Sequence, residues 1–357
     1  MSIERQLYFL TDEYIAGANQ YFKLSEEKLS ALNNALEMIR ESEELTSLAI
    51  FWKSLIYEHN NLDEYNVGNC PAPEREMGPA AGMFPLIVAI SNLPWLIEYY
   101  TMHQLSEVVL YDTLSDIGIV MEESRNRTGN WGIEAFLLDW LINHFQGRLF
   151  RIGRLQYIPI KNNVPVRVYR HCNSGKVVAI NGDGYPITPY GTALSRPVRL
   201  CVDEWELMLD EGDWLLDVHI PRGEKLDYEL LEESYQRAIE QFSRLLPEHS
   251  FKGFICDTWM FDPQLQEILP KTSNLVKFQA DYYLYQVVDS DSIYETVFVK
   301  KPKDLHTLPE ATTLQRAVKR HILSGKSMRS AAGFLLIDDL RRGPAYYQKK
   351  QGAIQLT

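Results

Sequence analysis

The period of the apolar pattern changes near Gly147, and this change constrains the fold more than any other feature. Up to about Gln146, apolar residues recur every three or four positions, as in amphipathic helices. Beyond Gly147, short alternating runs rich in β-branched and aromatic residues indicate strands. A chain of 357 residues also exceeds the usual size of one hydrophobic core. The sequence therefore predicts an α+β protein with two domains, all-helical over residues 1–146 and built on a mixed β-sheet with interposed helices over residues 147–345.

Five helical patterns are expected in the first domain. The clearest follows Ser25, a suitable N-cap, with Glu26 and Glu27 in the first turn where acidic residues favour a helix. The other four patterns cover residues 44–59, 83–111, 114–123 and 131–145. The Pro/Gly-rich segment 67–82 is predicted to be a loop.

The second domain is predicted to have the element order β-β-β-β-α-β-α-β-β. The expected strands are residues 148–160, 164–171, 176–188, 214–220, 251–259, 276–288 and 295–301, with helices at 227–246 and 262–270. Asn181 to Gly184 supply the turn residues that a tight hairpin needs, because such turns contain positive φ angles. Two further helical patterns, residues 309–323 and 327–340, are expected to form a basic helical tail.

The charge distribution limits the possible partners. The formal net charge is −12, yet residues 300–350 contain 12 Lys or Arg against 4 Asp or Glu. The remainder of the chain is correspondingly more acidic, so we expect no nucleic-acid binding by the whole molecule. The basic tail can still hold a smaller anion.

Export, membrane insertion and metal binding find no support in the sequence. The N-terminus carries acidic residues where a secretory leader has a basic end, and the best apolar run, residues 83–97, is too short and too interrupted to span a bilayer. A cytoplasmic protein without membrane association is expected. Four cysteines lie far apart without a C-x-x-C pair, so neither a zinc site nor a disulfide framework is predicted. These cysteines are Cys70, Cys172, Cys201 and Cys256.

A break between a strand and a helix, at Pro221-Arg222-Gly223, has two interpretations. A helix N-terminus leaves backbone N–H groups unpaired and can bind a phosphate, with Gly223 allowing close approach and Arg222 and Lys225 supplying positive charge. Alternatively, Asp227 caps the helix and acidic residues in its first turns satisfy its dipole without a ligand.

The second domain resembles the GNAT acyltransferases, in which two neighbouring strands splay apart to admit the pantetheine arm of acyl-coenzyme A. Three motifs are similar to a bacterial two-domain family with a helical N-terminal domain and a GNAT-like C-terminal domain. They are "DVHIPRG" from Asp217, "FICDTWMFDPQLQEILP" from Phe254 and "LPEATTLQRAVKRHILSG" from Leu308. The resemblance implies that acyl-coenzyme A is a co-substrate, with its pyrophosphate at Ile220, Arg222, Gly223 and Lys225. The loop departs from the GNAT pattern, since it has one glycine, a proline and the acidic Glu224.

The same resemblance makes His219 and Asp217 the leading candidates for the base that takes the proton of the acceptor amine. Alternation along the strand 214–220 places both side chains on one face. The ordinary alternatives are a histidine bonded to a backbone carbonyl and a solvated carboxylate. Cys256 is a candidate nucleophile if a cationic neighbour lowers its pKa, although a buried strand cysteine is usually inert.

Other polar residues of the second domain receive weaker assignments. Asp257, Thr258 and Trp259 end a strand where splayed strands expose polar groups to substrate, with Trp259 expected in the core or a pocket wall. The adjacent His171 and Cys172 point to opposite faces and form no dyad. One tyrosine of the run Tyr282, Tyr283 and Tyr285 can act as the acid that protonates the leaving thiolate. The basic residues Arg316, Lys319 and Arg320 can reach the adenosine 3′-phosphate or the acidic first domain.

The function predicted from these features is transfer of an acyl group from acyl-coenzyme A to an amine of a small molecule or peptide. The alternative is a non-catalytic binding or regulatory protein that keeps the fold after losing the phosphate loop, because fold alone does not fix function.

Overall fold

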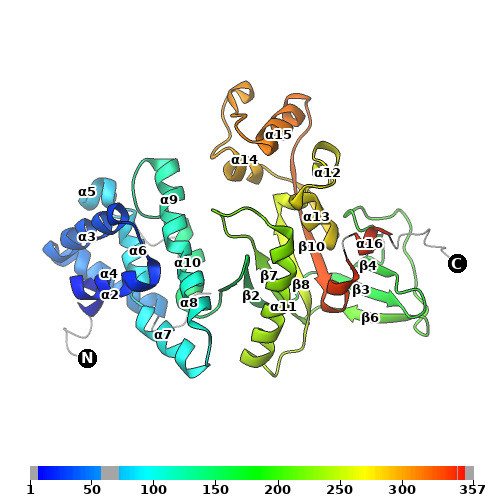
Figure 1. Cartoon of the computed structure of the whole chain (residues 1–357), viewed down its shortest axis with the longest axis horizontal. Helices are drawn as coiled ribbons and strands as arrows, with labels where there is room; N and C mark the ends of the chain where they lie inside the picture. The colour runs from blue at the N-terminus through cyan, green and yellow to red at the C-terminus, as the bar shows by residue number, and fades with distance from the viewer. Residues whose placement is uncertain (1–6, 58–71, 344, 350–357) are drawn as a thin grey trace. The chain divides into compact units, whose positions relative to one another are not determined.

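The computed structural model describes residues 7–57, 72–343 and 345–349 (Figure 1). The chain divides into two compact units. The first ends at Gln156 and also contains Pro221–Gly223, and the second comprises Tyr157–Ile220 and the chain from Glu224 onward.

The first unit is helical over its described residues up to residue 145, as predicted. Its α-helices are α2 (Asp12–Phe22), α3 (Glu26–Glu41), α4 (Glu43–Tyr57), α5 (Glu74–Met77), α6 (Met83–Ile90), α7 (Leu93–Met102), α8 (Glu107–Leu114), α9 (Asp116–Thr128) and α10 (Leu138–Phe145). Ser25 is the N-cap of α3 as predicted, although its side chain makes no capping hydrogen bond. The predicted loop at residues 67–82 contains the short helix α5, and its residues up to 71 lie outside the described residues.

The single helical pattern expected over residues 83–111 is instead three helices, α6, α7 and α8. Pro94 occupies the first turn of α7, where proline is tolerated but cannot continue a preceding helix. Gln104, just beyond α7, has a φ of 51°, which ends that helix. Every residue of α6 is buried, and α3, α4 and α10 pack against it. The apolar run that forms α6 therefore lies at the centre of the core. Because this helix has no polar face, the sequence pattern does not show where it ends and the next helix begins.

In the described part of the chain, no single helix is both long and apolar enough to cross a bilayer. The two segments Glu74–Ala80 and Met83–Met102 together reach that length and apolarity, but they are bent by 86° at their junction.

A six-stranded mixed sheet, sheet A, has the strand order β1-β2-β7-β8-β10-β9 and belongs to the second unit except for β1 and the first two residues of β2. Its strands are β1 (Phe150–Ile152), β2 (Leu155–Lys161), β7 (Trp214–His219), β8 (Phe251–Thr258), β9 (Tyr283–Asp289) and β10 (Arg329–Leu336). β7 and β8 run parallel, whereas β10 lies antiparallel between β8 and β9. The helix α11 (Tyr228–Leu245) crosses over from β7 to β8 and covers one face of these strands, as Figure 1 shows. Phe254 of β8 packs against Tyr235 of α11, with ring centroids 4.7 Å apart.

A second, four-stranded sheet, sheet B, lies between β2 and β7 in the sequence and has the order β5-β4-β3-β6. Its strands are β3 (Val166–His171), β4 (Val177–Asn181), β5 (Pro186–Ile187) and β6 (Trp205–Leu209), of which β6 was not predicted. In the predicted turn, Gly184 has a φ of +86°. The base of sheet B is closed by backbone hydrogen bonds from Asn162 N to Asp213 O and from Gly212 N to Asn162 O, each 2.7 Å long. Sheet B therefore takes the place of a hairpin turn between two neighbouring strands of sheet A.

Three predicted elements of the second domain are wrong. Residues 276–288 were expected to be one strand but form the end of α13 (Asn274–Asp281) followed by β9. Residues 295–301 were expected to be a strand, yet α14 (Ser292–Val297) buries Ile293 and Tyr294 in a local core, so packing overrides the β propensity of the run. Residues 327–340 were expected to be helical but contain β10. Seven of the eight residues of β10 are buried, so the strand lacks the alternation that identifies a half-exposed strand.

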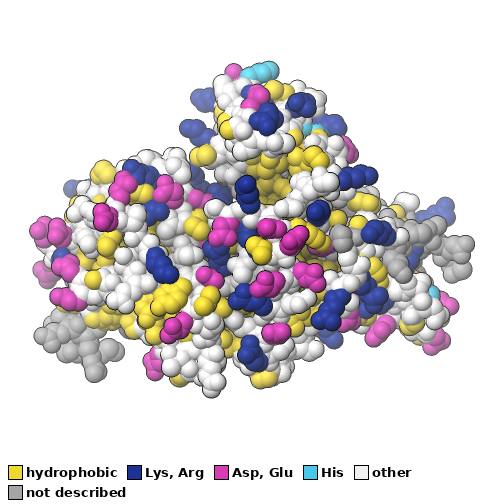
Figure 2. Space-filling view, viewed as in Figure 1, with side chains coloured by type: hydrophobic (Ala, Val, Ile, Leu, Met, Phe, Trp, Pro, Cys, Tyr) yellow, Lys and Arg dark blue, Asp and Glu magenta, His cyan; other side chains and the backbone are white. Residues whose placement is uncertain are grey.

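A local core joins the short helices of the second unit. It contains Trp259, Leu265 of α12 (Leu265–Ile268), Ile293 of α14 and Val318 of α15 (Thr313–Leu323). Figure 2 shows Lys and Arg side chains gathered on the surface of the segment that contains α14 and α15, in agreement with the basic composition of this part of the chain.

The carboxyl group of Asp281, at the end of α13, provides a test of the packing between α13 and α11. Burial raises the pKa of Asp281 to about 7, although the Tyr228 hydroxyl donates a 2.8 Å hydrogen bond that opposes this effect. In the unfolded chain an aspartate ionises near pH 4, so between about pH 4 and 7 the unfolded state binds fewer protons and stability falls as the pH rises. Because the side chain keeps some solvent access, we expect a loss on the order of 2 kcal/mol over this range.

Asp281→Asn should remove this part of the pH dependence and be more stable than the wild type at pH 8. Urea unfolding at several pH values checks the result, with Asp183→Asn in the exposed turn of sheet B as the matched control. Parallel pH profiles for the wild type and Asp281→Asn would contradict the assignment.

Candidate active site

The end of β7 brings together the two residues predicted to form the base. The Nε2 atom of His219 lies 3.2 Å from Oδ2 of Asp217, and the two side chains are 33% and 29% exposed. The contact shows that both side chains lie on one face of the strand, as the alternation predicts. A carboxylate at this distance can fix the orientation of the imidazole ring.

β7 and β8 separate beyond these residues. Their parallel register ends with Asp217 opposite Ile255, before β7 ends at His219 and before β8 ends at Thr258. β8 continues to pair with β10 on its other edge as far as Thr258 opposite Ala331. In the described residues, the two parallel strands are thus held together over their first halves and part at the level of the His219–Asp217 pair. A thioester arm that enters such a gap can use the free strand edges for hydrogen bonds.

Cys256, on β8, has an environment that disfavours a nucleophilic role. Its side chain is 1% exposed on the face that carries Phe254 and α11. Burial raises the pKa of its thiol well above the usual value, and the carboxylates of Asp217 and Asp257 add to the effect. A nucleophilic thiol needs the opposite shift, caused by a positive neighbour. Both charges that act on the thiol are negative, so its pKa shift is opposite to the one that the nucleophile hypothesis requires.

The remaining strand-end residues divide between structure and substrate contact. Thr258 caps the following 3₁₀ turn, since its hydroxyl accepts a 3.2 Å hydrogen bond from the Met260 N–H. Trp259 belongs to the local core, as expected for a packing residue. Asp257 is exposed, and its pKa is raised by local desolvation and by the neighbouring Asp217 carboxylate.

The three tyrosines of β9 and its approach have different surroundings. Tyr282 is buried, and its hydroxyl lies 3.0 Å from that of Tyr235. Tyr283 is buried too, and its hydroxyl donates to the Ile187 carbonyl. Tyr285 is less buried and makes no hydrogen bond to any described residue. Burial and the charges of Asp257 and Asp217 raise its pKa.

The connection from β7 to α11 contains the predicted pyrophosphate loop. Gly223 has a φ of +89°, a conformation that few other residues adopt, so the glycine has a backbone role. The Arg222 guanidinium lies 2.9 Å from the Glu123 carboxylate of α9. Asp227 caps α11 by accepting a 3.2 Å hydrogen bond from the Glu229 N–H. The backbone N–H groups of Arg222 and Gly223 have no acceptor among the described residues.

The other predicted features carry no catalytic arrangement. On α15, Arg316 and Lys319 bond to backbone carbonyls of the preceding segment and Lys319 also pairs with Glu310, so two of the three basic side chains are engaged locally. Within the described ranges, no group of three or more His, Cys, Asp or Glu side chains is placed to hold a metal ion. Cys172 and Cys201 are free and exposed, and Cys70 lies outside the described residues.

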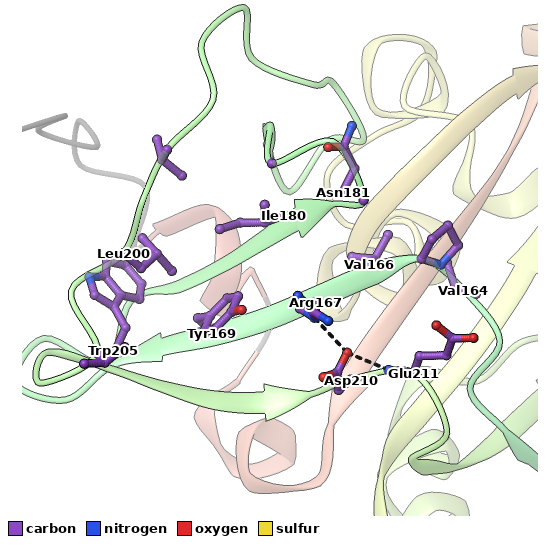
Figure 3. Close-up of a pocket in the computed structure, with 15 residues that line it drawn as sticks. Val164, Val166, Arg167, Tyr169, Ile180, Asn181, Leu200, Trp205, Asp210 and Glu211 are labelled. Carbon is purple, nitrogen blue, oxygen red and sulfur yellow. Dashed lines mark hydrogen bonds and ion pairs between the residues drawn. The ribbon is translucent and has the colours of Figure 1, made fainter.

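Sheet B carries a separate groove of about 360 Å³ on its outer face, shown in Figure 3. Tyr169, Ile180 and Trp205 form an apolar side, and Arg167 points toward Asp210, with a 3.0 Å contact between them. Asp210 is therefore paired, Glu211 is the other carboxylate of the lining, and the lining contains no histidine, cysteine or serine. We therefore place the candidate active site on sheet A.

A mixed sheet whose two parallel strands part beside a His–Asp pair, following a helical domain, defines a GNAT-like protein of two domains. Comparison of the sequence with known families agrees. Residues 13–147 match the N-acyltransferase N-terminal domain, and residues 149–335 match the GNAT-like C-terminal domain. The chain belongs to the two-domain family that these domains form.

Solved structures share the fold at low sequence identity. An acyltransferase in complex with decanoyl-CoA and teicoplanin is 23% identical, with a TM-score of 0.67 over 91% of this chain and 88% of that chain. An acyltransferase mutant in complex with octanoyl-CoA is 22% identical, with a TM-score of 0.68 over the same shares. An acyltransferase in complex with CoA and 10C-teicoplanin is 22% identical and has a TM-score of 0.62 over 94% of this chain and 100% of that chain. No curated protein sequence matches the chain.

Proposed function

We propose that the protein transfers an acyl group from an acyl-coenzyme A thioester to an amine of a small molecule or peptide. The observation that carries the proposal is the separation of β7 from β8 at Asp217 and Ile255, with His219 beside the gap. The solved structures that share the fold include acyltransferases bound to octanoyl-CoA and decanoyl-CoA. Two of them also contain teicoplanin or 10C-teicoplanin, which supports a peptide-derived glycopeptide as one class of acceptor to test.

In the proposed reaction, the thioester carbonyl lies at the gap between β7 and β8. His219, oriented by Asp217, accepts a proton from the acceptor amine as its nitrogen attacks this carbonyl. The carbon–nitrogen bond forms, the carbon–sulfur bond breaks, and the coenzyme A thiolate takes up a proton. Cys256 forms no covalent intermediate in this scheme, because direct attack by the amine needs none.

The pyrophosphate of the co-substrate is assigned to the β7–α11 connection. Ile220, Arg222, Gly223 and Lys225 line this connection, and the N–H groups of Arg222 and Gly223 are its available donors. Backbone N–H groups that precede a helix suit a phosphate because they add to the positive end of the helix dipole. The pairing of Arg222 with Glu123 would have to be shared with the phosphate.

A thermal shift measurement tests the proposal before an acceptor is known. Octanoyl-CoA at about 100 times its dissociation constant should add about 2.7 kcal/mol to the free energy of unfolding. Arg222→Ala should weaken octanoyl-CoA binding by about 10-fold, because one charge-assisted contact to phosphate is lost. The matched control is Arg237→Ala, at a partly exposed arginine of α11 that pairs with Glu233.

A second function is favoured by the contacts of the loop itself. Arg222 already has a carboxylate partner and Asp227 already caps α11, as in a protein that has no phosphate to bind. A non-catalytic binding or regulatory protein would show no thermal shift with any acyl-coenzyme A. That result would remove the transferase proposal and leave this second function in its place.

A further inference from the structure

Asp257 is the one carboxylate of the gap that the proposed reaction does not use. It follows the last register pair between β7 and β8 by two residues, and it is exposed at the end of β8. Because Asp217 and Ile255 are register partners, their side chains share a face of sheet A, and alternation places Asp257 on that face too. Asp257, Asp217 and His219 therefore lie on the face opposite α11, at the point where the strands part.

Tyr285 reaches the same face from β9. Phe334 of β10 is the register partner of both Ile255 and Tyr283, and the Tyr285 ring stacks against Phe334 with centroids 6.5 Å apart. Between Asp257 and Tyr285, β10 contributes Ala332 and Gly333, so no large side chain separates them. Consistent with this placement, the negative charges of Asp257 and Asp217 add to burial in raising the pKa of Tyr285. The mouth of the gap thus has two carboxylates, one imidazole and the hydroxyl of Tyr285, which makes no hydrogen bond to a described residue.

We propose that Asp257 positions the acceptor by holding its protonated amino group beside the His219–Asp217 pair, with the Tyr285 hydroxyl as a second polar contact. This inference rests on the proposed function and adds that the acceptor is a cationic amine. Two carboxylates side by side attract an ammonium group, and they give no such advantage to an uncharged acceptor. Asp217 is already engaged with His219, so Asp257 is the carboxylate available to the ligand.

The proton balance of the step follows from this assignment. The bound ammonium group first loses one proton to solvent and becomes the nucleophilic amine. As the carbon–nitrogen bond forms, His219 takes the second proton from the nitrogen, and it passes this proton to the coenzyme A thiolate when the carbon–sulfur bond breaks. The products are the amide, free coenzyme A and the one proton released to solvent.

The test compares a charged and an uncharged acceptor with octanoyl-CoA as donor, by following the release of the coenzyme A thiol. Benzylamine is cationic at neutral pH and aniline is not. Asp257→Asn should raise KM for benzylamine by about 10- to 100-fold, the effect of losing one hydrogen-bonded charge, and change kcat little. KM for aniline and the affinity for octanoyl-CoA should stay unchanged, and Asp257→Glu should restore most of the benzylamine affinity.

Asp203→Asn, at an exposed carboxylate of the segment that leads into β6, is the matched control and should leave KM for both amines unchanged. Thermal unfolding of each variant shows that the fold is intact. An unchanged KM for benzylamine in Asp257→Asn, or equal changes for both amines, would overturn the inference and leave the transferase proposal standing. If the wild type binds octanoyl-CoA yet releases no thiol with either amine, the transferase proposal fails and the inference falls with it.

Discussion

Replacement of His219 by alanine is expected to lower kcat/KM for acyl transfer by about 10²- to 10⁴-fold, the usual contribution of a general base. The imidazole lies 3.2 Å from Asp217 at the level where β7 and β8 part, so its loss removes the proton acceptor nearest the proposed reaction centre. The affinity for acyl-coenzyme A should stay unchanged, because the cofactor contacts are assigned to the loop that follows. The release of the coenzyme A thiol measures the rate, and thermal shift measures the affinity.

The control for this experiment is His306→Ala, because His306 is an exposed histidine of the same unit. His219→Gln serves as a second variant that retains hydrogen bonding but cannot take up a proton at neutral pH. A His219→Ala protein that folds normally and transfers acyl groups at the wild-type rate would remove His219 as the base.

The largest effect on stability is expected from Phe254→Ala in the middle of β8. Phe254 is fully buried, and its ring lies 4.7 Å from that of Tyr235 and 5.9 Å from that of Tyr157. Truncation leaves a cavity between sheet A and α11 and should cost about 3–5 kcal/mol. Urea unfolding followed by circular dichroism measures the loss. Phe51→Ala removes a ring that is 57% exposed and should cost much less; equal losses in the two variants would contradict the central position of Phe254.

Local sequence patterns predicted the elements that have one exposed face. In α11, Asp227 caps the helix and six of its residues are buried along one side, so both its start and its period are visible in the sequence. β3 alternates buried and exposed residues over Val166, Arg167 and Val168, and its limits were predicted to within two residues. One side of each of these elements is exposed to water and the other is buried. The alternation of polar and apolar residues that results is what makes the element visible in the sequence.

Elements without an exposed face were misjudged. α6 is buried on all sides, and the sequence pattern predicts one helix over α6, α7 and α8. β10 is buried along nearly its whole length, and the sequence pattern predicts a helix there. Its Ala-Ala-Gly run also lacks the β-branched and aromatic residues that are typical of strands. Since β10 separates β8 from β9, the neighbours of β8 in the sheet were hidden from any local pattern.

The candidate site was predicted in part. The shared face of Asp217 and His219 follows from alternation along one strand, and the structure confirms it. The arrival of Tyr285 near Asp257 depends on the position of β10, which the sequence did not reveal. The partner of Arg222 is likewise a long-range contact, since Glu123 lies about a hundred positions earlier in the chain.

The closure of sheet B at Asn162, Gly212 and Asp213 has a consequence for how such a protein can diversify. The chain leaves sheet A and returns to it at adjacent points, and lengthening a loop between fixed ends costs little conformational entropy. Insertions and deletions within the excursion can therefore accumulate while the strands that hold His219 keep their register. Homologues that act on different acceptors should differ most in this excursion and least in the strands on either side of it.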